Sequence, residues 1–210
     1  MIPQRNISLL SNRLAKEGGR RIPGAVLECD YCIAWFLVGL SGSGLRNSLV
    51  FKGPLPGTTV KEVKVDITID ERIVLPIEEK PVLKGYKEYN DLPDDAFIQV
   101  YSLEEILVEK VVALTDRARN EPRDLYDVWY LTELENMDLS ALVPEIRKKL
   151  EFRGKGLEGM GKDFGQKEAR LKKLWQIRLS NQMVELPHFE EVYRAVQRSF
   201  RSAALALMGV

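Results

Sequence analysis

Two aspartates lie on the apolar stripe of one predicted helix, and this feature restricts the fold more than any other in the sequence. The segment "EPRDLYDVWYL", residues 121–131, has Pro122 near its start, which favours the first turn of a helix. At 3.6 residues per turn, Asp124 and Asp127 share one face of that helix. Three aliphatic residues lie on the same stripe: Val128, Leu131 and Leu134. Buried carboxylates are costly unless a cation or a metal ion pairs with them.

A cation occupies a similar position in the preceding predicted helix, residues 102–119. Ser102 and Glu105 have the S-x-x-E spacing of a capping box, and Lys110 falls at the centre of the apolar face. Because a short connection favours antiparallel packing, the sequence predicts that Lys110 meets the two aspartates. One interpretation is a buried ion pair that locks the two helices. The other is a polar pocket in which Lys110 holds a phosphate and an aspartate acts as base or metal ligand.

The first hundred residues combine helices with short strands. Residues 6–19 and 23–40 have the pattern of two helices, the second strongly apolar. Residues 63–69 alternate between apolar and polar side chains, which predicts a strand. The remaining expectations are short strands at 49–53 and 96–101, an extension or partner of the main strand at 72–76, and a loop at 76–96.

From residue 102 onward the sequence predicts helices. After the two described above, helical patterns cover residues 139–152, 166–179 and 188–207, with a Gly-rich connector at 154–165. The predicted fold class is therefore α+β. Residues 1–101 are expected to hold N-terminal helices and a small sheet, and residues 102–210 a helical bundle.

One further carboxylate bears on the chemistry. Asp66 lies on the polar side of the predicted strand at 63–69. A strand carboxylate with a lysine nearby suits Mg²⁺-assisted phosphoryl transfer, which needs hard oxygen ligands for the metal and a cation for the phosphate. A lone strand aspartate is also commonly a solvated residue, so both interpretations remain open.

The segment "VYSLEEILVEKVVALTDRARNEPRDLYDVWYL", residues 100–131, resembles the signature region of the AbiEii/AbiGii nucleotidyltransferase toxin family. That family has an E-x4-K helix, matched here by Glu105 and Lys110, followed by a D-x-x-D helix, matched by Asp124 and Asp127. The opening of the chain, the "VKVDI" strand and the region around Trp175 are also similar to the family.

The resemblance implies a fold related to the DNA polymerase β-type nucleotidyltransferases. Such proteins are the toxin halves of type IV toxin–antitoxin or phage-defence systems, and some members transfer nucleotides from NTP to tRNA ends. The resemblance therefore implies an NTP substrate, Mg²⁺ as cofactor, tRNA as a possible acceptor and a cognate antitoxin protein.

The resemblance also implies roles for individual residues. Lys110 matches the lysine that holds the nucleotide phosphates, and Gly53 matches a glycine of the nucleotide-binding turn. Asp127, together with Asp124, matches the essential aspartate motif, so these two and Lys110 are the expected catalytic residues. Asp66 matches a strand carboxylate expected to bind metal. Glu105, the glutamate of the E-x4-K helix, is also explained by helix capping.

One departure from the family pattern concerns the metal. After a strand like "VFKG" the family continues with a second glycine, a small hydroxyl residue, a helix and a D-x-D strand. Here Gly53 is followed by Pro54, and no D-x-D strand lies between Gly53 and Asp66. The chain thus resembles a truncated nucleotidyltransferase core. Because two-metal transfer needs several carboxylates, we expect impaired or absent activity. The alternative is a non-catalytic remnant that binds a partner protein, a nucleotide or RNA.

Net charge leaves the partner open. Lys and Arg together number 31, as do Asp and Glu, so the formal net charge is zero. The stretch from residue 147 to 178 is locally basic. It fits an RNA-contacting face or, as the simpler interpretation, two solvated helix faces.

Cysteine and histidine usage excludes several classes. Cys29 and Cys32 are the only cysteines and His188 is the only histidine, so Cys and His cannot complete a four-ligand zinc site. A HEPN-type ribonuclease is disfavoured because no arginine lies in the required window before His188. The apolar run at 32–40 is too short to span a membrane, and no secretory signal is recognised. We expect a cytoplasmic protein without a membrane partner.

Overall fold

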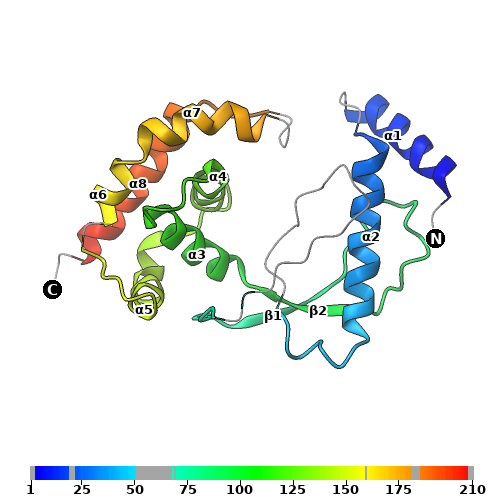
Figure 1. Cartoon of the computed structure of the whole chain (residues 1–210), viewed down its shortest axis with the longest axis horizontal. Coiled ribbons are helices and arrows are strands. Elements are labelled where there is room, and N and C mark those ends of the chain that lie inside the picture. Colours follow the sequence, from blue (N-terminus) through cyan, green and yellow to red (C-terminus); the bar gives the residue numbers. More distant parts are fainter. Residues whose placement is uncertain are drawn as a thin grey trace. The chain divides into compact units, whose positions relative to one another are not determined.

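The chain forms two compact units. The computed structural model describes residues 3–18, 22–50, 68, 70–158, 160–180 and 185–207. The first unit comprises Met1–Asp70 and Ile77–Tyr101, and the second comprises Glu71–Pro76 and Ser102–Val210. Figure 1 shows the helices and strands of both units.

The first unit combines two helices with a small sheet. Its elements are α1 (Gln4–Gly18), α2 (Gly24–Ser41), β1 (Ile77–Pro81) and β2 (Phe97–Tyr101). The two strands are antiparallel, with Ile77 opposite Tyr101 and Pro81 opposite Phe97. Tyr89 is fully buried in the core of this unit, and its hydroxyl donates a 2.8 Å hydrogen bond to the carbonyl of Leu27 on α2.

The second unit is helical. Its elements are α3 (Leu103–Thr115), α4 (Pro122–Trp129), the π-helix η1 (Tyr130–Leu134), the 3-10 helix η2 (Leu139–Leu142), α5 (Val143–Phe152), α6 (Met160–Gly165), α7 (Glu168–Leu179) and α8 (Phe189–Leu207). Trp175 is buried in its core, and its indole N–H donates to the carbonyl of Pro187 at 3.0 Å. A helix-rich chain with a small antiparallel sheet confirms the predicted α+β class.

Local sequence signals explain both ends of α3. The helix begins after Ser102, whose hydroxyl accepts the backbone N–H of Glu105 at 3.1 Å, as the capping spacing predicted. It ends at Thr115, earlier than the predicted end at residue 119. The side chain of Asp116 accepts the N–H of Ala118 at 3.1 Å, and this local turn competes with continuation of the helix.

Three expectations about local structure were wrong. The predicted loop at 76–96 contains strand β1, and the Gly-rich connector contains the short helix α6. The segment 72–76 is not a strand. Two predicted strands lie almost entirely outside the described residues. Of the strand predicted at 63–69 only Thr68 is described, and of the strand predicted at 49–53 only Leu49 and Val50 are described. None of these three residues is in a strand.

The end of the α4 stripe also differs from the prediction. Leu134 was expected on the apolar face, but it is 53% exposed, whereas Leu131 is buried. The cause is the π-helix at Tyr130–Leu134, which has more residues per turn than the 3.6 on which the stripe was counted.

Helix α2 is the most apolar element among the described residues. It has 18 residues, and by length and composition alone it could cross a membrane, a test that core helices of soluble proteins also pass. Its buried residues are Leu27, Tyr31, Ala34 and Leu37.

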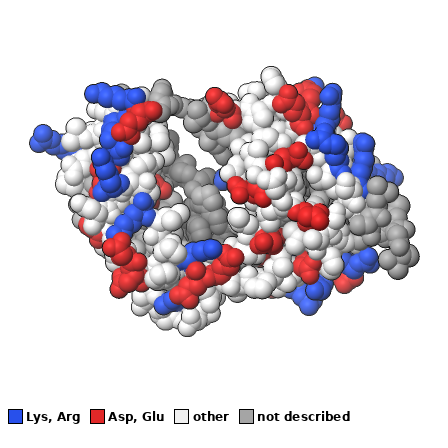
Figure 2. All heavy atoms as spheres, turned by 180° about the vertical axis from the view of Figure 1, so that it is seen from behind, with Lys and Arg blue, Asp and Glu red and all other residues white. Residues whose placement is uncertain are grey.

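Charges of both signs are interspersed on the surface drawn in Figure 2. Several basic residues of the 147–178 stretch are in ion pairs: Arg153 with Glu71 at 3.1 Å, Lys155 with Asp116 at 3.5 Å and Lys172 with Glu190 at 2.6 Å. Such pairing favours the simpler interpretation of solvated helix faces with mixed charge over a continuous cationic stripe for RNA.

Candidate functional site

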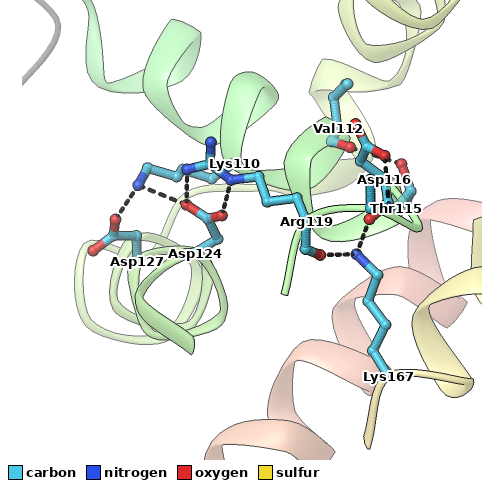
Figure 3. Close-up of polar contacts among 9 residues, drawn as sticks. Lys110, Val112, Thr115, Asp116, Arg119, Asp124, Asp127 and Lys167 are labelled. Carbon is cyan, nitrogen blue, oxygen red and sulfur yellow. Dashed lines mark hydrogen bonds and ion pairs between the residues drawn. The ribbon is translucent and has the colours of Figure 1, made fainter. Parts of the chain in front are cut away.

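Lys110 joins the two aspartates of α4. Its Nζ lies 2.9 Å from Oδ1 of Asp124 and 2.6 Å from Oδ2 of Asp127 (Figure 3). The lysine comes from α3 and the carboxylates from α4, so one ammonium group bridges two neighbouring helices. The pairing predicted from the two apolar faces is therefore present in the structure, while the catalytic role of these residues stays a prediction.

Asp124 has a second cationic partner that the sequence did not indicate. Arg119, in the loop between α3 and α4, donates from Nε to Oδ2 at 2.5 Å and from Nη2 to Oδ1 at 3.1 Å. The Asp124 side chain is only 1% exposed. Burial alone would raise the pKa of Asp124, but the hydrogen bonds from Arg119 and the charge of Lys110 outweigh it and lower that pKa. Asp124 thus remains a buried anion whose two oxygens are both engaged.

Asp127 is more accessible than Asp124. Its side chain is 25% exposed, and Lys110 contacts its Oδ2. Burial would lower the pKa of Lys110, but the negative charges of Asp127 and Asp124 raise it overall. Lys110 therefore stays a cation at neutral pH, and Asp127 is the carboxylate of this pair that solvent reaches.

Lys167 holds the loop that carries Arg119. This buried lysine immediately precedes α7, and its Nζ donates to the backbone carbonyls of Asp116 and Arg119, the latter at 2.6 Å (Figure 3). Burial lowers the pKa of Lys167 to about 8. No sequence signal separated this lysine from the solvated lysines around it, because its role depends on the fold of a loop almost fifty residues earlier.

The lowered pKa of Lys167 predicts a pH effect on stability. Between pH 8 and 10.5 the unfolded chain keeps this proton while the folded chain releases it, so raising the pH favours the folded state. We expect the unfolding free energy of the wild type, relative to Lys167→Met, to rise by about 2 kcal/mol between pH 8 and 10. Urea titrations at several pH values measure this difference. Lys162→Met, at an exposed position, is the control. If the unfolding free energies of the wild type and Lys167→Met changed in parallel with pH, the expectation would be contradicted.

The other predicted site residues lie elsewhere. Gly53 and Asp66 are outside the described residues. Glu105 is fully buried, and its carboxylate contacts Lys149 of α5 at 2.5 Å. Lys110, the other residue of the E-x4-K pattern, is paired with the aspartates of α4.

The described part of this network does not fit a magnesium ion. Among the described residues no group of three or more His, Cys, Asp or Glu side chains could hold a metal. The oxygens of Asp124 are already engaged by Arg119 and Lys110. Mg²⁺ requires several oxygen ligands in near-octahedral geometry, so binding there would require these ion pairs to break.

Comparison with known proteins identifies the family. The family model described as nucleotidyl transferase AbiEii toxin, type IV toxin–antitoxin system, matches residues 44–202. The match spans most of the chain, and the chain therefore belongs to the AbiEii family of nucleotidyltransferase-like toxins. No curated protein and no solved structure matched. Family membership implies a nucleotide substrate and a cognate antitoxin.

Proposed function

We propose that this chain is an AbiEii-family protein in which nucleotide transfer is impaired and the Lys110 network acts mainly as a lock between α3 and α4. The observation that carries the proposal is the state of Asp124, which is 1% exposed and bonded on both oxygens to cations. A triphosphate that bound Lys110 would have to compete with two carboxylates already in contact with it. Breaking a buried ion pair is costly because it leaves a charge uncompensated.

The sequence supports the same conclusion. Two-metal nucleotidyl transfer stabilises the attacking and leaving oxygens with ions held by several carboxylates. The sequence between Gly53 and Asp66 contains no D-x-D motif, where the family resemblance expects one. Loss of residues that act as a catalytic unit lowers rates by several powers of ten.

A second candidate is nucleotide or RNA binding without transfer. The Lys110 side chain is 21% exposed and the Arg119 side chain is 53% exposed, so both cations reach solvent although they are paired. In intact relatives the corresponding reaction would move a nucleotide from NTP to tRNA with Mg²⁺. In a cytoplasmic phage-defence setting, a chain that binds without transferring could still act through its antitoxin partner.

A transfer assay tests the proposal. Purified protein, Mg²⁺, each labelled NTP and bulk tRNA are mixed, with an intact family member that carries the D-x-D motif as positive control. We expect the wild type to label tRNA no more than a control reaction without Mg²⁺ does. The variants Lys110→Ala, Asp127→Ala and the exposed control Glu104→Ala are run alongside. Label that persists in Glu104→Ala and disappears in both other variants would show an active site and overturn the proposal.

A further inference from the structure

A fully buried ion pair lies apart from the Lys110 network. Glu105 on α3 and Lys149 on α5 have side chains with 0% exposure, and Lys149 Nζ lies 2.5 Å from Oε1 of Glu105. Forty-four residues separate the two in sequence. Two buried charges are tolerated only when their geometry and remaining hydrogen bonds satisfy both groups, so this pair must have further partners.

The other oxygen of Glu105 binds backbone amides of a distant segment. The N–H groups of Val74 and Leu75 donate to its Oε2 at 3.1 and 2.9 Å. The side chains of Val74 and Leu75 are partly buried against the core of the second unit. One carboxylate therefore fixes both a cation from α5 and two consecutive amides of the chain.

The segment that contains Val74 and Leu75 is also held through Glu71, three residues before Val74. Glu71 lies 3.4 Å from Nζ of Lys149, and both of its oxygens accept from Nη2 of Arg153, at 3.2 and 3.1 Å. We call Glu71–Pro76 the anchor segment. It belongs to the second unit, although the residues before and after it, Asp70 and Ile77, belong to the first.

These contacts explain why the anchor segment is not a strand. The amides of Val74 and Leu75 bond to a side chain and not to a neighbouring strand. Amides that are withdrawn from water and have no acceptor are costly, and for these partly buried amides the Glu105 carboxylate is the acceptor.

We propose that Glu105 and Lys149 are positioning residues that fasten the anchor segment to α3 and α5. The glutamate of the E-x4-K helix then acts by fixing the chain immediately before β1, and Lys110 of the same helix serves the separate network with α4. The anchor segment is thus a part of the second unit that lies, in sequence, between two stretches of the first. This role does not depend on whether the protein transfers nucleotides.

Local release of the anchor segment tests the proposal. The decisive variant is Glu105→Met/Lys149→Met, which removes both buried charges together, so no lone charge remains to unfold the helices. The matched control is Glu104→Met/Lys148→Met, at the neighbouring exposed positions. Hydrogen exchange measured by mass spectrometry reports on the amides of Val74 and Leu75, and trypsin reports on cleavage after the exposed Arg72.

We expect exchange at Val74 and Leu75 and cleavage after Arg72 to accelerate at least about tenfold in the decisive variant, with exchange in α7 near Leu171 unchanged. The control should match the wild type. The proposal is overturned if the decisive variant also behaves like the wild type. It is equally overturned if exchange in α7 accelerates as much as in the anchor segment, because that result indicates global loosening and no specific positioning.

Discussion

Lys149→Met is expected to lower the free energy of unfolding by about 3–5 kcal/mol, the usual cost of leaving one member of a buried ion pair without its partner. Glu105 would then remain buried without its cationic partner, and only the amides of Val74 and Leu75 would donate to its carboxyl group, at Oε2. The double variant Glu105→Met/Lys149→Met should be more stable than this single variant, because well-packed apolar side chains replace both charges.

Urea unfolding of the wild type, both single variants and the double variant gives the coupling energy between Glu105 and Lys149. The exposed Lys148→Met is the control and should change stability by less than about 0.5 kcal/mol. Additive effects of the two single substitutions would show that the charges do not depend on one another and would contradict the buried pair.

The two aspartates of α4 are expected to differ sharply in their contribution to stability. Asp124→Asn should cost about 2–3 kcal/mol, because it removes the charge that receives hydrogen bonds from both Arg119 and Lys110. Asp127→Asn should cost about 1 kcal/mol or less, because Asp127 is partly solvated and Lys110 keeps its contact with Asp124.

The pH dependence gives an independent check on Asp124. Its pKa is lower in the folded protein than the ordinary value of 3.8. The stabilisation that ionised Asp124 contributes to the folded state is therefore complete above pH 3.8, and it is lost as the pH falls through the lower, folded-state pKa. We expect the stability gap between wild type and Asp124→Asn to be constant near neutral pH and to shrink in acid. The assignment of Asp124 as a buried, paired anion would be contradicted by equal stability costs for Asp124→Asn and Asp127→Asn. It would also be contradicted if the gap between wild type and Asp124→Asn did not shrink in acid.

Much of the helical framework could be predicted because its signals are local. Each of these signals acts on residues only a few positions away. They are the Ser102 cap of α3, Pro122 at the start of α4 and the 3.6-residue periodicity of the apolar side chains. Strand β1 could not be found in the same way. Its sequence, "IEEKP", is mostly charged and exposed, and it becomes a strand only through its pairing with β2.

The candidate site was predictable only in part. A lysine and two aspartates on facing apolar stripes indicated a pairing, and the structure contains it. Arg119 and Lys167 could not be found, because one acts from a loop and the other binds that loop through backbone carbonyls. Glu105 occupies a capping position at the start of α3, and that position was a sufficient explanation of the residue from sequence alone. The sequence therefore did not indicate that its carboxylate binds Lys149 of α5 and the anchor segment.

The π-helix at the end of α4 has a consequence for comparing this chain with its relatives. A π-helical turn contains about one residue more than an α-helical turn, so positions after Tyr130 are out of phase with those before it. An alignment through the D-x-x-D helix that allows no gap there would pair the exposed Leu134 with inward-facing residues of relatives whose helix is regular. A one-residue gap placed between Trp129 and Leu134 would restore the equivalence with any relative in which this turn is α-helical.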